Sequence, residues 1–266
     1  MHGVEIKIEK FEKEHYPNLL NKLDLSYNEM VKKLEAMTYV SAHKYDSKAH
    51  TNEEYEVEEK LSLPYFNKAF LNYIKKNHTF PTQDEYIAHY WESNKVKLSS
   101  FTSNEYKQAI NNRAISAYAS LIRELMFAFF IKDKLKDKNI DVIYNEKLDS
   151  VAHIDIMICG KYNWGIHLYT NTRRGKYFRK KKNDREGIFF TNVKELDLEL
   201  DLSRERKSYG NIFLYDEIDF QHLLELCRNL SITHNWNSGL PFRKYNEYFL
   251  TILCTFIENF TLTIFS

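Results

Sequence analysis

The stretch Val151–Thr170, which reads VAHIDIMICGKYNWGIHLYT, is the strongest indicator of architecture in this chain. Its first part, Val151–Cys159, and its last part, Trp164–Thr170, are rich in strand-forming residues, and a short turn at 160–163 separates them. Two such runs joined by a turn predict the paired strands of a β-hairpin. Charged side chains are depleted in strand interiors, so Asp155, in the middle of the first run, needs a physical explanation.

The pattern on either side of this hairpin alternates between helices and strands. A long helix, roughly 104–136, precedes it and is apolar nearly all round in its middle, which is typical of a buried helix. The remaining elements are expected as a short strand at 142–144, a polar turn at 145–150, a basic helix at 173–186 closed by Gly187, strands at 188–202 and 211–215, and a helix at 220–230. This order predicts an α/β (α+β) fold. The hairpin leads into a β-α-β crossover, which gives a mixed sheet with helices on both faces.

Residues 1–110 are expected to form a helical region. Apolar residues recur there at helical spacing, and Thr82, which follows Pro81 and precedes two acids, matches a helix start. The polar, acidic stretch 41–59 is expected to be a loop or a solvated helix. Because no linker is apparent, we expect this region to pack against residues 111–266, which hold the sheet and end in an apolar element at 248–265.

The overall composition favours no particular partner. The chain has 38 lysines and arginines against 37 aspartates and glutamates, so only local charge could indicate nucleic-acid binding. Cys159, Cys227 and Cys254 lack metal-ligand spacing and are expected to be reduced core residues. No signal peptide is visible, and the apolar C-terminal run contains Glu258 and lacks flanking basic residues. We therefore expect a cytoplasmic protein with no membrane partner.

Asp155 and His167 are the candidate chemical groups of the hairpin. A buried Asp155 must pair with a cation or hold a metal ion, whereas the alternative is a solvated strand face shared with His153 and Met157. His167 lies at the centre of the second run and comes near Asp155 if the two strands pair. A lone histidine in a strand is more often a hydrogen-bonded core residue than a ligand.

The long helix contributes a third candidate, Glu124. It lies among alanine, leucine and phenylalanine residues, and a buried glutamate demands a partner. That partner is either a metal ion or a cation such as Arg113 or Arg123. The alternating acids of residues 195–201 look like a further metal site, but leucines fill the other face, as expected of a half-exposed strand, and we assign them no chemistry.

Residues 173–185 carry the strongest local charge, with eight cations against one acid. Like charges at helical spacing repel each other, and phosphate groups would relieve that repulsion with release of counterions. We therefore expect phosphate contacts from Arg173, Arg174, Lys176, Arg179 and Lys180. The alternative is a solvated face neutralised by the acids at 195–201 or by Glu186.

The block from Glu124 through Lys182 resembles the restriction-endonuclease-like, or PD-(D/E)XK, nuclease superfamily. The core of that family is a helix, a three-strand meander, a helix and further strands, with an Asp on the second strand and a Glu-x-Lys on the third. Glu124 matches the acid that many members carry on the first helix, and Asp155 matches the strand-two acid. The third-strand positions hold His167 and Tyr169, so the Glu-x-Lys is absent. The resemblance spans roughly residues 120–230.

The resemblance implies a Mg²⁺ (or Mn²⁺) site held by Glu124, Asp155 and the Leu168 carbonyl, with His167 as a further ligand or a base. Some family members move the lysine to the helix after the third strand. Lys181 or Lys182 would then orient or deprotonate the attacking water, with Lys176 and Lys180 as alternatives.

These features predict a metal-dependent DNA endonuclease of restriction, mobile-element or phage-defence type. The helical region would contribute to DNA binding or target choice. Many endonucleases need two active sites to cut both strands, which either a homodimer or a partner subunit would supply. Two alternatives stay open. One is a catalytically inactive nucleic-acid-binding or scaffold protein on the same fold, and the other is an interaction protein unrelated to nucleic acid.

Overall fold

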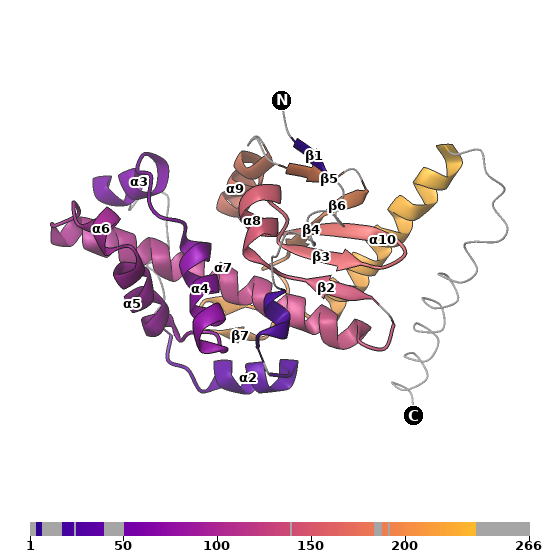
Figure 1. The fold of residues 1–266 in the computed structure, drawn as a ribbon, viewed down its shortest axis with the longest axis horizontal. Helices are drawn as coiled ribbons and strands as arrows, with labels where there is room; N and C mark the ends of the chain where they lie inside the picture. The colour runs from indigo at the N-terminus through magenta and orange to yellow at the C-terminus, as the bar shows by residue number, and fades with distance from the viewer. Residues whose placement is uncertain are drawn as a thin grey trace. The chain divides into compact units, whose positions relative to one another are not determined.

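The computed structural model describes residues 4–6, 18–23, 25–39, 51–138, 140–183, 188–190 and 192–237, and Figure 1 shows its ribbon. Within these ranges the structure does not describe the side chains of residues 4–6, 151, 174, 178, 181–183, 188, 189 and 231–237. The chain divides into two compact units, 1–221 and 222–266, and the division falls inside helix α10 (Glu217–Asn237). This helix confirms the one predicted at 220–230, whereas the apolar element expected at 248–265 lies outside the described residues.

The first unit contains a four-stranded mixed sheet with the strand order β2-β3-β4-β6. Its strands are β2 (Asp141–Ile143), β3 (Ile156–Cys159), β4 (Asn163–Thr170) and β6 (Val193–Leu200). The β2–β3 and β3–β4 pairs are antiparallel, and β4 and β6 are parallel neighbours joined through helix α9 (Arg173–Asn183). The predicted hairpin, crossover and α/β fold class are therefore confirmed.

Two smaller strand pairs accompany the main sheet. β1 (Val4–Ile6) pairs in parallel with β5 (Ile188–Phe190), and β7 (Ser208–Tyr209) forms a hairpin with β8 (Ile212–Phe213). The strand predicted at 188–202 thus divides into β5 and β6, which belong to different sheets.

The segment before β3 is a helix, and the turn and strand predicted there are wrong over residues 146–154. Helix α8 (Glu146–Ala152) begins at Asn145, whose side chain accepts hydrogen bonds from two backbone N–H groups of the first turn. It ends at His153, which adopts a left-handed conformation with φ 60°. Leu148 and Ile154 pack into a buried cluster with Met157, so these residues serve the core from a helix and the loop after it.

Helices cover both faces of the main sheet, as predicted. Successive strand residues point to opposite faces, so Met157 and Ile156 lie on different sides. Helix α8 packs on the Met157 side through Leu148. Leu168, which lies on the Ile156 side of the sheet, lines a cavity together with Leu121 of α7 (Asn104–Leu135).

Five helices precede α7 in the described part of the chain. They are α2 (Tyr27–Glu35), α3 (Asn52–Glu59), α4 (Phe66–Asn77), α5 (Gln83–Ser93) and α6 (Lys95–Leu98), after a single turn of 3₁₀ helix, η1 (Leu19–Asn21). Thr82 caps α5 in a capping box with Glu85, which confirms the predicted helix start. We call residues 51–103, with α3 to α6, the helical layer.

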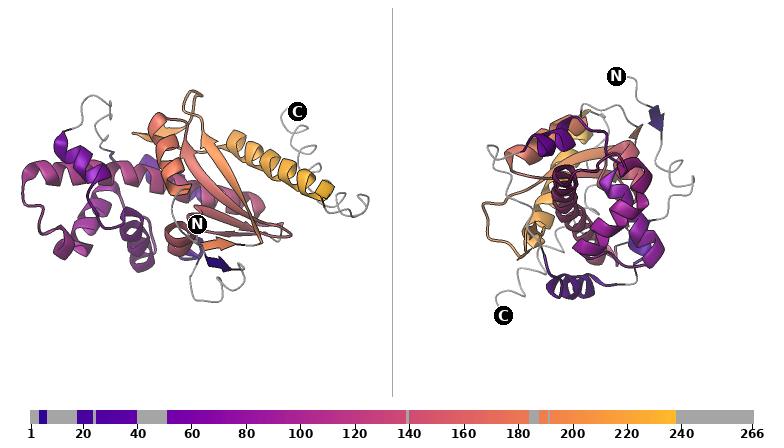
Figure 2. Two further views of the ribbon diagram at one scale, coloured as in Figure 1. Left: turned by 90° about the horizontal axis from the view of Figure 1, so that it is seen from above. Right: turned by 90° about the vertical axis from the view of Figure 1, so that its left-hand side faces the viewer.

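Helix α7 packs against both the helical layer and the sheet (Figure 2). Near the helical layer, the ring of Tyr118 lies 6.3 Å from that of Phe70 in α4, and further along Phe127 stacks on Tyr215 at 4.6 Å. α7 is the one helix among the described residues that is long and apolar enough to cross a membrane. However, 67% of its apolar window is buried inside the protein, as expected of a core helix in a soluble protein.

Candidate active site

A cavity of about 720 Å³ lies where the helical layer meets the end of β4. Its walls are formed by the segment between α3 and α4, the middle of α7, residues 168–172 and the first turns of α9. Glu124 of α7, Asp155 before β3 and Leu168 of β4 all line it. The fold therefore places the three predicted metal ligands, from separate elements, in the lining of one cavity, which we call the Glu124–Asp155 cavity.

Asp155 is held against β4 by two hydrogen bonds. Its backbone N–H donates to the Ile166 carbonyl (3.0 Å), and its Oδ2 accepts from the Leu168 N–H (2.7 Å). The residue lies at the bend before β3 and is 4% exposed, which excludes the solvated strand face and corrects its predicted position inside the strand. In an antiparallel strand the N–H and C=O of one residue point to the same neighbour. The Leu168 carbonyl therefore lies at the same edge of β4 as the Asp155 carboxylate.

Carboxylates of the cavity affect the pKa of two buried tyrosines, and Glu124 and Asp155 act on both. Burial raises the pKa of Tyr144 well above its ordinary value, and the charges of Glu124, Asp149 and Asp155 raise it further. Burial also raises the pKa of Tyr215, and Asp155 and Glu124 act in the same direction. Glu124 and Asp155 therefore both contribute to the electrostatic environment of these two tyrosines.

Arg123 adds a cation to the same cavity. Its Nε donates a hydrogen bond to the Phe213 carbonyl (2.9 Å), the one acceptor that its guanidinium has within the described part of the chain. Burial lowers the pKa of Arg123, and the neighbouring Glu124 carboxylate acts in the opposite direction. Arginine stays protonated in proteins, so the cavity contains an anchored guanidinium group. Such a group is well suited to phosphate and carboxylate partners.

His167 occupies the expected place in β4, but the residues that line the cavity do not include it. Its Nδ1 lies 2.9 Å from the His153 carbonyl, its Nε2 lies 2.9 Å from Glu195 Oε2, and the residue is 2% exposed. The hydrogen bond from His167 lowers the pKa of Glu195. The strand alternates, so Leu168 faces the cavity and His167 faces the other side. His167 is thus the hydrogen-bonded core histidine that the sequence left as the alternative to a ligand.

The acids of β6 pair with cations of α9. Lys176 Nζ lies 3.4 Å from Glu199 Oε2, and Arg179 Nε donates to Asp197 Oδ1 at 2.7 Å. These contacts match the alternative reading of the basic segment, in which strand acids neutralise it. Arg179 nevertheless lines the Glu124–Asp155 cavity, so one of the predicted phosphate-binding residues does reach the site.

The other predicted cations of α9 divide into two groups. Arg173 and Lys180 are exposed to solvent. The side chains of Arg174, Lys181 and Lys182 lie outside the described residues, so the predicted catalytic lysine and one predicted phosphate contact stay predictions.

Gly175 allows α9 to begin at Arg173, soon after β4 ends at Thr170. A Cβ atom at this position would collide with the carbonyl oxygen of Thr170, which is backbone and has no freedom to move aside. Both residues line the Glu124–Asp155 cavity. The glycine therefore allows the basic helix to begin at the wall of the site.

Sequence reasoning missed Asp149, Arg123 and Tyr65, which also line the cavity. Asp149 fell in a predicted turn, and its carboxylate accepts a hydrogen bond from Asn67 Nδ2 of α4. The helix-cap signal of Asn145 followed by an acid could have revealed α8 and with it this residue. Arg123 was considered only as a salt-bridge partner of Glu124, and no sequence signal distinguished Tyr65.

Among the residues that the structure describes, no three His, Cys, Asp or Glu side chains form a group that could hold a metal ion. Comparisons of the chain with protein-family models, curated proteins and solved structures found no match. The geometry of the Glu124–Asp155 cavity is therefore the main guide to function.

Proposed function

We propose that this protein is a metal-dependent nuclease that hydrolyses phosphodiester bonds of DNA at the Glu124–Asp155 cavity. The observation that supports this most strongly is that Glu124, Asp155 and Leu168, from three different elements, line one cavity. The order α7, β2, β3, β4, α9, β6 also follows the helix, meander and helix order of restriction-endonuclease-like cores, with α8 inserted between β2 and β3 and β5 between α9 and β6.

The groups in the cavity fit Mg²⁺ or Mn²⁺. Mg²⁺ commonly binds through one or two carboxylates and keeps waters and substrate phosphates as its remaining ligands, so a third protein carboxylate is not required. Glu124 and Asp155 would hold the ion, with the Leu168 carbonyl at the same edge as Asp155. When bound, such an ion polarises a phosphoryl oxygen and lowers the pKa of a bound water.

The protein's own groups supply orientation and positive charge. The Leu168 N–H fixes the Asp155 carboxylate in one direction, so the carboxylate is preorganised. Arg123, anchored by the Phe213 carbonyl, is placed to contact a phosphate oxygen and to stabilise charge that develops on it. In this proposal Arg123 replaces the lysine that the third strand lacks.

Isosteric substitutions of the two acids test the proposal. Asn at position 155 keeps an oxygen that can accept from the Leu168 N–H, while it removes the charge. We expect the wild type to cleave supercoiled plasmid or circular single-stranded DNA with Mg²⁺ or Mn²⁺. Asp155→Asn and Glu124→Gln should each lose at least about 100-fold in rate, more than the roughly 10- to 100-fold typical of an outer-shell partner.

Asp141→Asn is the matched control, because Asp141 is an exposed acid of β2 that does not line the cavity. Its cleavage rate should equal that of the wild type. A second measurement is the thermal unfolding midpoint, which Mn²⁺ should raise for the wild type and much less for Asp155→Asn. Equal cleavage by Asp155→Asn and the wild type, or no cleavage with any divalent metal, would refute the proposal.

The missing Glu-x-Lys favours one rival, a nucleic-acid-binding protein on the same fold without catalysis. His167, at one of the two motif positions, has both ring nitrogens engaged by His153 and Glu195. This rival predicts salt-dependent DNA binding that survives Asp155→Asn, with no cleavage and no Mn²⁺-dependent rise in the unfolding midpoint.

A further inference from the structure

The size and depth of the Glu124–Asp155 cavity restrict what can enter it. Its volume of about 720 Å³ is within the range of small-ligand pockets, roughly 300–1,000 Å³. Asp155 is 4% exposed, so a phosphate on the outside of an intact duplex is poorly placed to reach it.

Contacts between the helical layer and the core hold the walls of the cavity together. Tyr177 of α9 donates a hydrogen bond to Glu59 of α3 (3.0 Å), and both helices contribute walls. On the other side of α3, Asn112 of α7 donates to Glu54 (2.8 Å). These contacts connect α3 of the helical layer to α9 and α7 beside the cavity.

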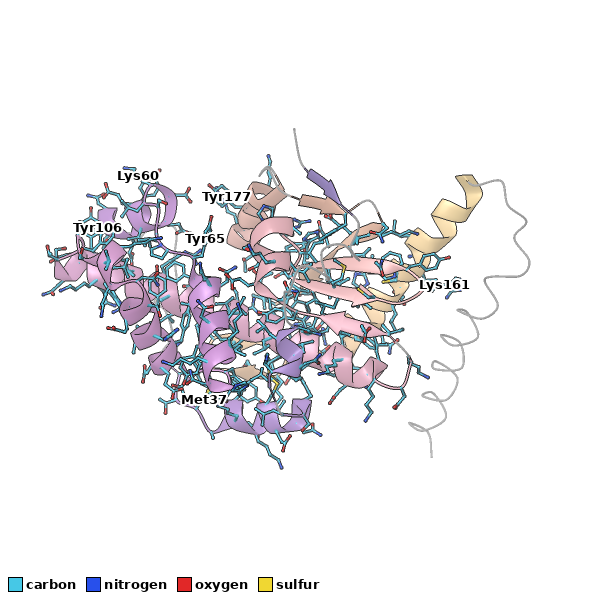
Figure 3. The ribbon with its side chains drawn as sticks, in the orientation of Figure 1. Met37, Lys60, Tyr65, Tyr106, Lys161 and Tyr177 are labelled. Atoms are coloured by element: carbon cyan, nitrogen blue, oxygen red, sulfur yellow. The ribbon has the colours of Figure 1, made fainter. Side chains whose placement is uncertain are left out.

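Tyr65 provides a flat apolar surface at this cavity. It lies between α3 and α4, lines the cavity and is 70% exposed. Figure 3 labels Tyr65 beside α4 and Tyr177 on α9. The next residue, Phe66, has its ring stacked on Tyr90 and covered by Arg113, which fixes the backbone on which Tyr65 stands. Arg113, Arg123 and Arg179 line the cavity together with four acids, Glu58, Glu124, Asp149 and Asp155. An exposed aromatic ring beside such arginines can stack an unpaired base while they contact its phosphate.

We propose that the cavity accepts an unpaired nucleotide of single-stranded nucleic acid, with its base stacked on Tyr65 and its phosphate directed to Arg123. This rests on the proposed function, since it names the substrate form that the same site would cleave. A double-stranded substrate would have to open or extrude a nucleotide first, at a cost that a mismatch or a bubble reduces.

Binding measurements that avoid cleavage test this inference. Fluorescence anisotropy without divalent metal would compare a labelled single-stranded DNA oligonucleotide, the RNA of the same sequence, the blunt DNA duplex and a duplex with a short unpaired bubble. The variants are Tyr65→Ala, Tyr65→Phe and the matched control Tyr55→Ala. Tyr55 is 53% exposed on α3 and does not line the cavity.

The single strand and the bubble should bind at least about tenfold more tightly than the blunt duplex. Tyr65→Ala should weaken single-strand binding roughly 5- to 150-fold, the range that loss of one stacked base gives, whereas Tyr65→Phe and Tyr55→Ala should match the wild type. The RNA arm decides which nucleic acid is preferred. Thermal unfolding of Tyr65→Ala checks that this exposed substitution leaves the fold intact.

Equal affinity for duplex and single strand, or a Tyr65→Ala variant that binds like the wild type, would overturn the inference. Its failure is distinguishable from failure of the nuclease proposal. Tyr65-dependent binding of single strands without metal-dependent cleavage would leave this inference standing and remove the nuclease. Metal-dependent cleavage of intact duplex that is insensitive to Tyr65→Ala would support the nuclease proposal and overturn this inference.

Discussion

Asp155 has a structural role besides its proposed chemical one, and different substitutions separate the two. Its carboxylate satisfies the Leu168 N–H, and a buried N–H without an acceptor costs about 1–3 kcal/mol. We expect Asp155→Ala to lower the free energy of unfolding by about that amount, and Asp155→Asn to lower it by much less. Urea unfolding of both variants measures this difference. Equal losses of stability in the two variants would contradict the assigned hydrogen bond.

Arg123 should matter for rate more than for metal binding. Arg123→Ala is expected to reduce cleavage by about 10²- to 10³-fold, because it removes a fixed positive group beside the reacting phosphate. Arg123→Lys should recover part of the loss, since it restores the charge without the guanidinium geometry. The Mn²⁺-dependent rise in the unfolding midpoint should persist in both variants.

Lys107→Ala, which removes an exposed cation from the first part of α7, is the control for Arg123. If Arg123→Ala cleaves as fast as this control, the anchored guanidinium has no part in the reaction.

At the residue scale, the sequence revealed those acids that stood out against apolar surroundings. Asp155 and Glu124 were visible because charge inside an apolar run is costly and needs a cause. The role of His167 could not be predicted, because a histidine in a strand can be either a metal ligand or a hydrogen-bonded core residue. Its partner Glu195 comes from the strand next to it, and only the parallel register of β4 and β6 brings the two together.

Helix α9, which carries the basic charge, is predicted to bind phosphate. The acids of β6 compete with phosphate for the cations of α9. Asp197 pairs with Arg179, whereas Lys180 is exposed. Lys180→Ala should therefore weaken nucleic-acid binding and reduce the slope of log K against log salt by about 0.7–0.9. Asp197→Asn should strengthen binding and increase the slope by a similar amount, because it releases Arg179. Salt titrations of binding affinity measure both changes.

The opposite signs of these two effects make the test strict. Two unchanged slopes would show that α9 is a solvated face of the protein without phosphate contacts.

The connection from β8 to α10 should make stability depend on pH in acid. Burial raises the pKa of Asp216, but the hydrogen bonds and charge of Arg204 outweigh this and hold it below its ordinary value of 3.8. Arg204 contacts it with two hydrogen bonds, at 2.8 and 2.9 Å. A carboxylate whose pKa is lowered on folding stabilises the protein above its unfolded pKa, and this contribution is lost as pH falls through the folded pKa.

Asp216→Asn is therefore expected to be less stable than the wild type at about pH 7, with a gap that shrinks below about pH 4. Urea midpoints across this range measure the gap. A gap that stays constant down to about pH 2 would show that Asp216 is not paired as a carboxylate in the folded protein.

At the element scale, long periodic segments were predictable and short ones were not. Helix α7 has enough turns for its pattern to be clear, and β4 follows a turn and is eight residues long. Helix α8 has seven residues and runs into Ile154, which is itself strand-forming, so a local pattern could not separate helix from strand. The missed helix is also why Asp149 was missed.

At the scale of the first unit, the class of the sheet could be predicted but the cavity could not. The sheet order follows from local signals and short connections, which limit the possible topologies. The cavity depends on how the helical layer docks, and that rests on pairs distant in sequence. Tyr106 of α7 with Glu56 of α3, and Lys75 of α4 with Glu146 of α8, are such pairs. Tyr65 gains its position from this docking, and no motif in the sequence announces it.

Because the helical layer and the sheet both pack against α7, the protein is poorly suited to study by truncation. One 32-residue helix carries the ring of Tyr118 for the helical layer and Glu124 for the cavity, so no boundary along the chain separates the helical layer from the proposed active site. Deleting residues 51–103 would expose to water the apolar side chains of α7 that pack against the helical layer. The truncated chain would therefore be expected to aggregate. Individual functions are therefore better assigned by exchanging single side chains than by trimming the ends.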